Sequence, residues 1–506
     1  MTPDRDHALI FVVGFVIYNL VMIGIGIWYS RGKSEGKSYL TGGSSLPTFL
    51  VFATMGATLI GTGSSIGATA NGFKMGWGGS AYGLGAFFGV LVLVWVMYKD
   101  KIRSKGFVTM AEEAQYLFGG SLPVKHVMAV MMMIIEIIWL GNHINGGATY
   151  LSFITHIDPV WARLIMAVVF GIYVVIGGLL AVVITDAIQL MIILVGFVVI
   201  TVIAIPTAGG WEVIRQTMEE GGKGGGLTFY GVGALGVMGL ISLIFTIAIP
   251  CLGTPTYRMR WYYANNDKSA KKALTNSAIL LFVFSLVPAI IGMAAFTIAY
   301  RTDAAGVMER PDYAFVYMAT QVLGPMLGML FMCAGLSATV SSGDSDAIAC
   351  VTIFIQDVYP IITGNELEES KVKMWSRIAV CLALGFAFLA TLFATDVMGY
   401  ISNVIGSIIP GVSIAMLLGA VWKRVTWQGG LASIFSGLVF GVLFLGTDAF
   451  RKLIIDSFTG PAIPASIVAV IFGVAVSLMT PASTKTEEER MAAVLASRGK
   501  NIDAGH

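Results

Sequence analysis

The sequence predicts an all-α membrane protein in which about 13 transmembrane helices include two inverted five-helix repeats. Three observations lead to this prediction. The 506 residues are 56% hydrophobic and only 12% charged, which is typical of polytopic membrane proteins and not of soluble enzymes. About thirteen apolar runs are long enough to cross a bilayer. Two of these runs are interrupted near their middle and lie five spans apart, a spacing that indicates an internal repeat.

The apolar runs also set the domain boundaries that we expect. The expected units are 1–46 (an extra helix and a charged loop), 47–206 (first repeat), 231–425 (second repeat), 426–480 (two further helices) and 481–506 (a polar tail in water). A glycine-rich polar loop over 209–226 separates the repeats.

The loops between spans predict the orientation of the chain. If the N-terminus is outside, the loops and tail on the cytoplasmic side hold 22 of the 31 Lys and Arg residues. This excess predicts an outside N-terminus and a cytoplasmic C-terminus. We expect the membrane to be the inner (plasma) membrane of a bacterium. The expected spans are 8–29, 47–72, 77–98, 124–153, 160–178, 180–206, 231–257, 273–300, 315–358, 374–394, 397–421, 427–447 and 462–480.

The two interrupted spans predict where a binding site lies. The second span contains Gly56–Ser65, in which glycines and hydroxyls fall at mid-membrane, and the seventh contains Ile249–Thr256, with two prolines. Unwound backbone survives at that depth only where it lines a cavity or is packed in protein. We therefore expect a site between the two breaks.

The stretch Ser337–Asp346 carries hydroxyls and two acids inside the apolar run 323–354. On a helix, Ala338, Ser341, Ser342 and Ser345 share one face. Hydroxyls and carbonyls arranged in this way suit a hard monovalent cation. The alternative is that the hydroxyls join two helices by hydrogen bonds. Asp344 and Asp346 favour a functional role, because a buried acid needs a partner.

Together these motifs resemble the sodium:solute symporter family over about residues 8–425. The family uses the leucine-transporter fold, with one extra helix before the inverted repeats and two after them. The resemblance is carried by Gly56–Ile60, Gly177–Gln189, Arg260 with the following Trp-Tyr-Tyr-Ala, Ala338-x-x-Ser341-Ser342, and Gln356–Tyr359.

The resemblance implies a sodium site and a second ion site. The carbonyls of Ala57, Ile60 and Ala338 and the hydroxyls of Ser341 and Ser342 would bind one sodium ion. Five neutral oxygens replace most of a hydration shell without preventing release. The second site would be formed by Asp186, Ser341, Asp344 and Ser345. Asp344 would either strengthen the binding of this ion or carry a proton, and Asp186 has the alternative of a structural acid at its helix end.

One branch of the family, the high-affinity choline transporters, is similar in more detail. The similar segments are Arg103–Met110, Glu136-x-x-Trp139 and Ser341–Ser345. The resemblance implies that Trp139 forms one wall of an aromatic cage for a quaternary ammonium, held by cation–π attraction. The sequence has Leu59 and Thr254 where that branch has two tryptophan walls. We therefore expect a cationic or zwitterionic solute rather than choline itself.

Further residues are predicted near the solute and its outer gate. Glu136 either balances a cation or pairs with His143. His143 is either a proton relay or a hydrogen-bonded packing residue. Tyr400 and Asn403 are expected either to gate the site or to pack. The expected solute contacts are Gly61, Thr62, Glu136, Trp139, His143, Thr254, Thr256 and Tyr257.

The resulting prediction is a sodium-coupled symporter that imports a small organic solute by alternating access. Its partners would be the solute, sodium ions and the lipid bilayer, as a monomer or weak homo-oligomer. We expect no enzyme activity, no cofactor and no metal other than sodium, and a net charge of +2 gives no case for nucleic acid. The alternatives are a proton-coupled symporter for an amino acid or monocarboxylate, with Asp344 or Asp186 titrating, and a non-accumulating channel or sensor.

Overall fold

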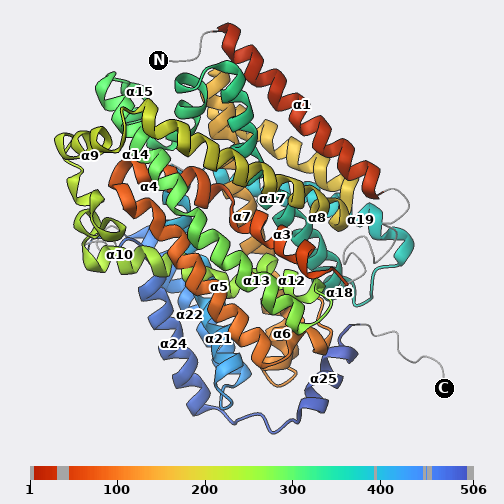
Figure 1. The fold of residues 1–506 in the computed structure, drawn as a ribbon. Coiled ribbons are helices and arrows are strands. Elements are labelled where there is room, and N and C mark those ends of the chain that lie inside the picture. The colour runs from red at the N-terminus through yellow and green to blue at the C-terminus, as the bar shows by residue number, and fades with distance from the viewer. Residues whose placement is uncertain (1–4, 31–44, 393–395, 448–451, 453–457, 499–506) are drawn as a thin grey trace.

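Helices form nearly all of the chain that the computed structural model describes, which comprises residues 5–30, 45–392, 396–447, 452 and 458–498 (Figure 1). Within these ranges, the strand-like pairing is one isolated bridge between Leu46 and Ala264. Eleven helices in the described part are long and apolar enough to cross a membrane. The thirteen expected spans outnumber these eleven helices for two reasons. The span 47–72 is divided between the shorter helix 48–59 and the run 63–99, which also contains 77–98, and the span 160–178 falls on the shorter apolar segment 159–175.

In the first half of the chain, the expected spans 160–178 and 180–206 fall on the apolar helical segments Pro159–Val175 and Leu179–Thr207, both within α8. The elements of this half are α1 (Arg5–Ser30), α3 (Thr48–Leu59), η1 (Gly63–Gly67), α4 (Ala68–Met75), α5 (Ala81–Lys99), α6 (Met110–Leu117), α7 (Leu122–Thr155) and α8 (Pro159–Thr207).

The connection between the halves was expected to be a loop, and this is wrong for its centre. Trp211–Glu220 forms helix α9, in which Arg215 pairs with Glu212 one turn before it and Glu219 one turn after it, each at 2.7 Å. Such pairs stabilise an exposed helix by a few tenths of a kcal/mol each. The glycines expected to form the loop flank α9 instead of interrupting it.

The second half follows the expected order. Its elements are α10 (Val232–Ala248), α11 (Pro250–Gly253), α12 (Pro255–Tyr263), α13 (Asp267–Phe284), α14 (Leu286–Arg301), α17 (Pro325–Ile353), η8 (Phe354–Val358), α19 (Val372–Thr391), η10 (Tyr400–Ile405) and α21 (Gly406–Val421), followed by α22 (Trp427–Gly446), α24 (Ala462–Met479) and α25 (Glu487–Ala496).

Both expected breaks are present. Helix α3 ends at Ile60, whose φ of −87° and ψ of 63° lie outside the helical region. The helical backbone begins again in η1. Thr254 separates α11 from α12 with φ −84° and ψ 115°. Pro255 follows it and lacks the N–H that a continuous helix would use there, so a new helix begins at this residue.

Helix α17 is central to the packing. It contacts α1, α3, α7, α8, α12 and α19, and its residues 334–353 are all buried. Figure 1 shows it in the middle of the bundle. The hydroxyls and acids of α17 therefore face other helices rather than lipid.

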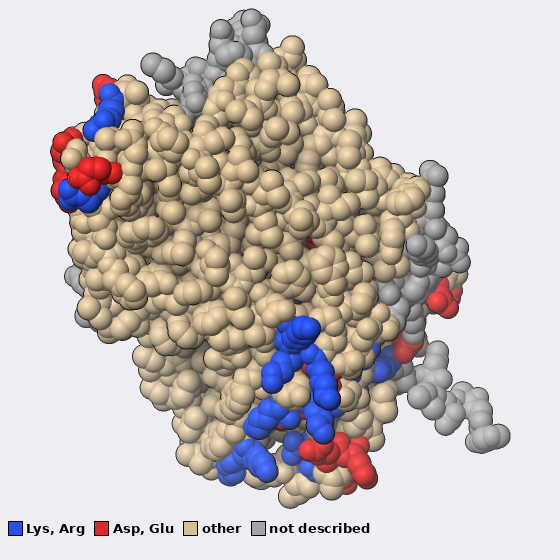
Figure 2. All heavy atoms as spheres, viewed as in Figure 1, with Lys and Arg blue, Asp and Glu red and all other residues tan. Residues whose placement is uncertain are grey.

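On the face shown in Figure 2, charged side chains avoid the middle of the surface. Figure 2 shows an uncharged belt, with Lys and Arg gathered below it over the ends of α5, α6 and α13. The tail was expected to lie in water, yet α25 packs on α6, with Val494 fully buried and the Arg498 guanidinium donating to both Glu112 oxygens at 2.6 and 2.7 Å.

Candidate functional site

Buried serines of α17 meet the carbonyls of the first broken helix. The Ser341 hydroxyl donates to the Ala57 carbonyl at 3.1 Å, and the Ser342 hydroxyl to the Thr58 carbonyl at 3.0 Å. Both also reach the Ala338 carbonyl one turn back, at 3.4 and 3.2 Å. We call these five residues the hydroxyl–carbonyl cluster.

The hydroxyl–carbonyl cluster gathers four of the five residues expected at the sodium site. The fifth, Ile60, ends α3 at the break, while the second carbonyl that the serines contact belongs to Thr58. Gly61 leaves room for this approach, because a β-carbon there would lie 2.5 Å from the Ser342 hydroxyl. A hydroxyl can rotate and present its lone pairs, so these oxygens can either bond to each other or face a cation.

The expected second ion site contains a cation of the protein itself. Arg260 Nη2 donates to the Ser345 hydroxyl at 2.5 Å and to the hydroxyls of Thr54 and Thr58 at 3.2 and 3.1 Å. It lies 3.9 Å from Asp186 Oδ2, which also accepts from Thr54 at 2.5 Å. The structure thus brings Asp186 and Ser345 together around an arginine.

Asp344 differs from Asp186 in its surroundings. Its side chain is fully buried on α17, and within the described residues neither of its oxygens has a hydrogen-bond partner. Two turns before it along the helix, the Ser337 hydroxyl bonds to the Tyr18 hydroxyl of α1 at 2.7 Å. A buried carboxyl in this state needs a proton or a cation to be satisfied.

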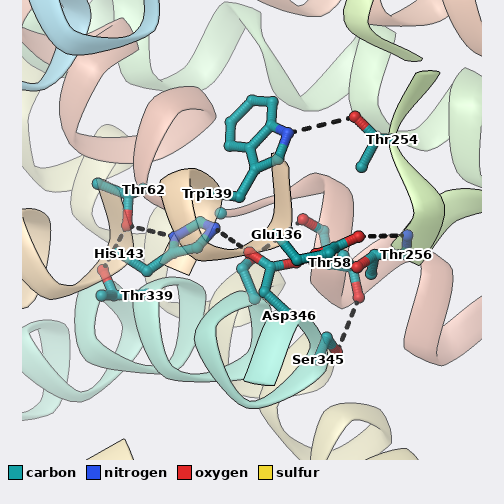
Figure 3. Close-up of polar contacts among 12 residues, drawn as sticks. Thr58, Thr62, Glu136, Trp139, His143, Thr254, Thr256, Thr339, Ser345 and Asp346 are labelled. Carbon is teal, nitrogen blue, oxygen red and sulfur yellow. Dashed lines mark hydrogen bonds and ion pairs between the residues drawn. The ribbon is translucent and has the colours of Figure 1, made fainter. Parts of the chain in front are cut away.

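A second cluster joins α7, α12 and α17 (Figure 3). The backbone N–H of Thr256 donates to Glu136 Oε1 at 2.7 Å, and the Thr256 hydroxyl donates to Asp346 Oδ1 at 3.1 Å. Both acids are buried, and Glu136 Oε2 has no partner among the described residues. One residue of the second broken helix therefore holds two carboxyl groups side by side.

His143 and Trp139 complete this cluster. His143 Nε2 lies 3.2 Å from Asp346 Oδ2, and its Nδ1 lies 2.9 Å from the Thr62 hydroxyl. The Trp139 indole N–H donates to the Thr254 hydroxyl at 3.2 Å, and its ring stacks with the imidazole at 6.4 Å between centroids. We call Glu136, Trp139, His143, Thr254, Thr256 and Asp346 the acidic cluster.

The acidic cluster borders two small cavities that share the side chains of Leu59, Tyr82, Trp139 and Tyr257. Each has about 10 Å³ for the centre of a water molecule, so each can hold about one water. An organic solute needs several hundred Å³, which means that the helices must move apart to admit one. Tyr82 on α5 was not predicted from the sequence, where it stands in no recognisable motif.

The two expected gate residues lie in η10. Tyr400 is buried, and its hydroxyl would lie 3.0 Å from a β-carbon added at Gly141, so it packs on α7 two residues beyond Trp139. Asn403 is half-buried, and its carbonyl accepts from the Ser407 hydroxyl at 2.5 Å. Tyr400 thus contacts α7 at Gly141, while Asn403 is one turn further along η10.

Two broken helices, neutral oxygens beside one break and a closed site between them are features of a sodium-coupled transporter with the leucine-transporter fold. Solved structures agree with this fold. A Na⁺-coupled sialic acid symporter, in a substrate-bound outward-open state, superimposes with a TM-score of 0.75 over 94% of this chain and 99% of that one, at 17% identity. Mhp1, a nucleobase-cation-symport-1 family transporter, gives 0.57 over 91% and 99%, at 12% identity.

Sequence comparison identifies the family. Residues 39–437 match the sodium:solute symporter family, and the chain belongs to it. The sodium/glucose cotransporter of Vibrio parahaemolyticus is 26% identical over 87% of this chain and 86% of its own length. Sodium-coupled monocarboxylate transporter 2 of Bos taurus is 23% identical over 86% and 72%.

The family confirms several predictions. The protein is a multi-pass membrane transporter and not an enzyme, and it couples sodium to a small-molecule solute. The fold class is confirmed as well. The relatives are named for sugars, inositol and monocarboxylates, so the closer likeness to choline transporters stays a prediction.

Proposed function

We propose that this symporter imports a small solute that carries a cationic amine. The observation that supports it is the pair of buried acids, Glu136 and Asp346, which meet at Thr256 beside the Trp139 ring. Burying two acids is costly unless a cation compensates them, and an indole face adds cation–π attraction for an ammonium. A neutral sugar would offer these acids no positive charge.

In this proposal the hydroxyl–carbonyl cluster, with Ile60 at the helix end, binds the coupling sodium ion. All its oxygens are neutral, and it joins α17 to α3. Sodium bound there would hold the first broken helix against α17, so each ligand would raise the other's affinity through the shared arrangement. Gly61, Thr62, Thr254 and Tyr257 line the solute path, and Tyr400 and Asn403 gate it.

We propose that Asp344 is the acid that binds the second coupling ion. Of its four expected residues, Asp186 already lies near Arg260, and Ser345 is engaged by the same guanidinium. Asp344 is fully buried without a hydrogen-bond partner in the described chain. Either a second sodium ion or a proton satisfies it, and this observation also favours the proton-coupled alternative.

With the N-terminus outside, inward sodium flow would supply the driving force in a bacterial inner membrane. One charge moved through 100 mV gives about 2.3 kcal/mol, or roughly fifty-fold accumulation. Figure 2 shows more Lys and Arg at the lower end of the molecule than at the upper end, and this excess supports the orientation.

The test is the thermal stability of the purified protein with a panel of small cationic and zwitterionic amines, and with glucose, myo-inositol and lactate, each in sodium and in potassium. A ligand that binds the folded state raises the melting temperature. We expect an amine of this panel to stabilise the protein in sodium and not in potassium. Stabilisation by glucose, inositol or lactate instead would overturn the amine, and amine stabilisation that ignores sodium would favour proton coupling.

A further inference from the structure

Arg258 bridges the break in the second broken helix. It lies on α12, and its Nε and Nη2 atoms donate to the Leu252 carbonyl of α11 at 3.1 and 3.0 Å. In an unbroken helix that carbonyl would accept from the N–H of Thr256, four residues on. That N–H donates to Glu136 instead. The arginine therefore replaces the hydrogen bond that the break removes.

Glu113 on α6 neutralises this arginine. Its Oε1 forms an ion pair with Arg258 Nη1, and its Oε2 accepts from the Tyr262 hydroxyl at 2.5 Å. The side chains of Arg258 and Glu113 are 1% and 0% exposed. Removing one partner of so deeply buried a pair leaves an uncompensated charge, so the pair stays closed unless both groups reach water or new partners.

The same helix α6 holds the end of α17. The Thr109 hydroxyl, at the start of α6, donates to Asp357 Oδ1 in η8 at 3.1 Å. Helix α6 is thus attached to both elements that carry the acidic cluster on this side, α12 through Glu113 and α17 through Asp357. A movement of α12 away from α17 must break one of these two contacts.

We propose that Glu113, Arg258 and Tyr262 form a clasp that holds α12 in the closed position, and that the solute site opens toward α6 only when this clasp breaks. The clasp acts through Thr256, whose N–H and hydroxyl reach Glu136 and Asp346 and which lies two residues from Arg258. Its members are positioning residues and do not contact the solute cavities. The proposal rests on the symporter fold and not on the amine.

Cys251 provides a reporter for this opening. It is buried on α11 and lines one of the two small cavities with Trp139 and Tyr257. In a background where the other three cysteines, Cys333, Cys350 and Cys381, are replaced by alanine, a water-soluble methanethiosulfonate modifies Cys251 only when the site is open. The reagent is added to the α6 side of vesicles that contain the full chain, without sodium.

We expect Glu113→Gln to raise the modification rate of Cys251 about tenfold, because a neutral amide holds the guanidinium less strongly and shifts the population toward the open state. Arg258→Lys keeps the charge but loses the fork of donors, and its rate should lie between those of Glu113→Gln and the parent. Glu112→Gln is the matched control, since Glu112 bonds to Arg498 of the tail and not to α12. Its rate should equal that of the parent.

A rate for Glu113→Gln equal to that of Glu112→Gln would overturn the clasp. If Glu113→Gln does not fold, Tyr262→Phe removes one hydrogen bond without leaving a buried charge, and about a threefold rise is expected. A folded Tyr262→Phe variant with the parent's rate would contradict the proposal equally. The assay needs no solute, so a wrong solute class leaves its result unchanged.

Discussion

The hydroxyl–carbonyl cluster and the acidic cluster are built on the same helix with opposite chemistry. Ser341 and Ser342 face the first broken helix with neutral oxygens. Asp346, one turn further along α17, bonds to the second broken helix through its carboxyl group and lies beside the His143 imidazole. Neutral oxygens bind a small ion without preventing its release, whereas carboxylates supply the counter-charge that a buried organic cation needs.

The sharpest test of this contrast is Asp346→Asn. We expect the concentration of a stabilising amine needed for half-maximal effect to rise about thirtyfold or more, because removing one partner of a buried charge pair costs about 2–5 kcal/mol. Sodium affinity should stay within about twofold. The measurement is the melting temperature titrated with each ligand. An equal loss of sodium affinity would show that the two clusters are not separate.

Ser342→Ala tests the neutral side. The loss of one hydroxyl ligand to an ion costs about 1.5–3 kcal/mol, so the sodium concentration for half-maximal stabilisation should rise about tenfold or more. Ser376→Ala is a matched control, since Ser376 is equally buried and its hydroxyl bonds to the Val372 carbonyl within α19. If the two variants respond alike to sodium, Ser342 is not a ligand.

Trp139→Ala probes the aromatic side of the acidic cluster. A cation–π contact contributes about 1–2 kcal/mol when desolvated, so amine affinity should fall about fivefold to thirtyfold with sodium affinity unchanged. The indole also bonds to Thr254, and Thr254→Val separates that hydrogen bond from the ring. Unaltered amine binding in Trp139→Ala would assign the ring to packing.

The smallest effect is expected far from both clusters. Arg498→Ala breaks the contact between the tail and Glu112, a partly exposed pair worth about 1 kcal/mol or less. The melting temperature should fall by a few degrees at most, with both ligand affinities as in the parent. A change in sodium affinity would mean that the tail is coupled to the transport site.

The parts of the fold and site that could be predicted depend on local chemistry. Ser341 and Ser342 recur at helical spacing in an apolar run, so their shared face follows from periodicity, and the breaks at residues 60 and 254 follow from glycine and proline. That Thr58 offers its carbonyl depends on the backbone angles at Ile60, which no side-chain pattern encodes.

Other features depend on tertiary packing. Glu113 and Arg258 are 145 residues apart. Each stands in a polar segment where charged residues are common, so the sequence does not indicate that they form a pair. The glycines on either side of Trp211–Glu220 predict a loop, yet this segment forms helix α9, whose own charges pair at helical spacing.

The contact between Thr256 and Glu136 has an evolutionary consequence. The donor is a main-chain N–H released by the break before it, so every residue except proline at position 256 supplies the same donor. A substitution at this position can remove the hydroxyl that bonds to Asp346 and keep the backbone hydrogen bond to Glu136. Descendants of this protein can therefore change one half of their solute recognition by point mutation, while the other half is inherited with the shape of the backbone.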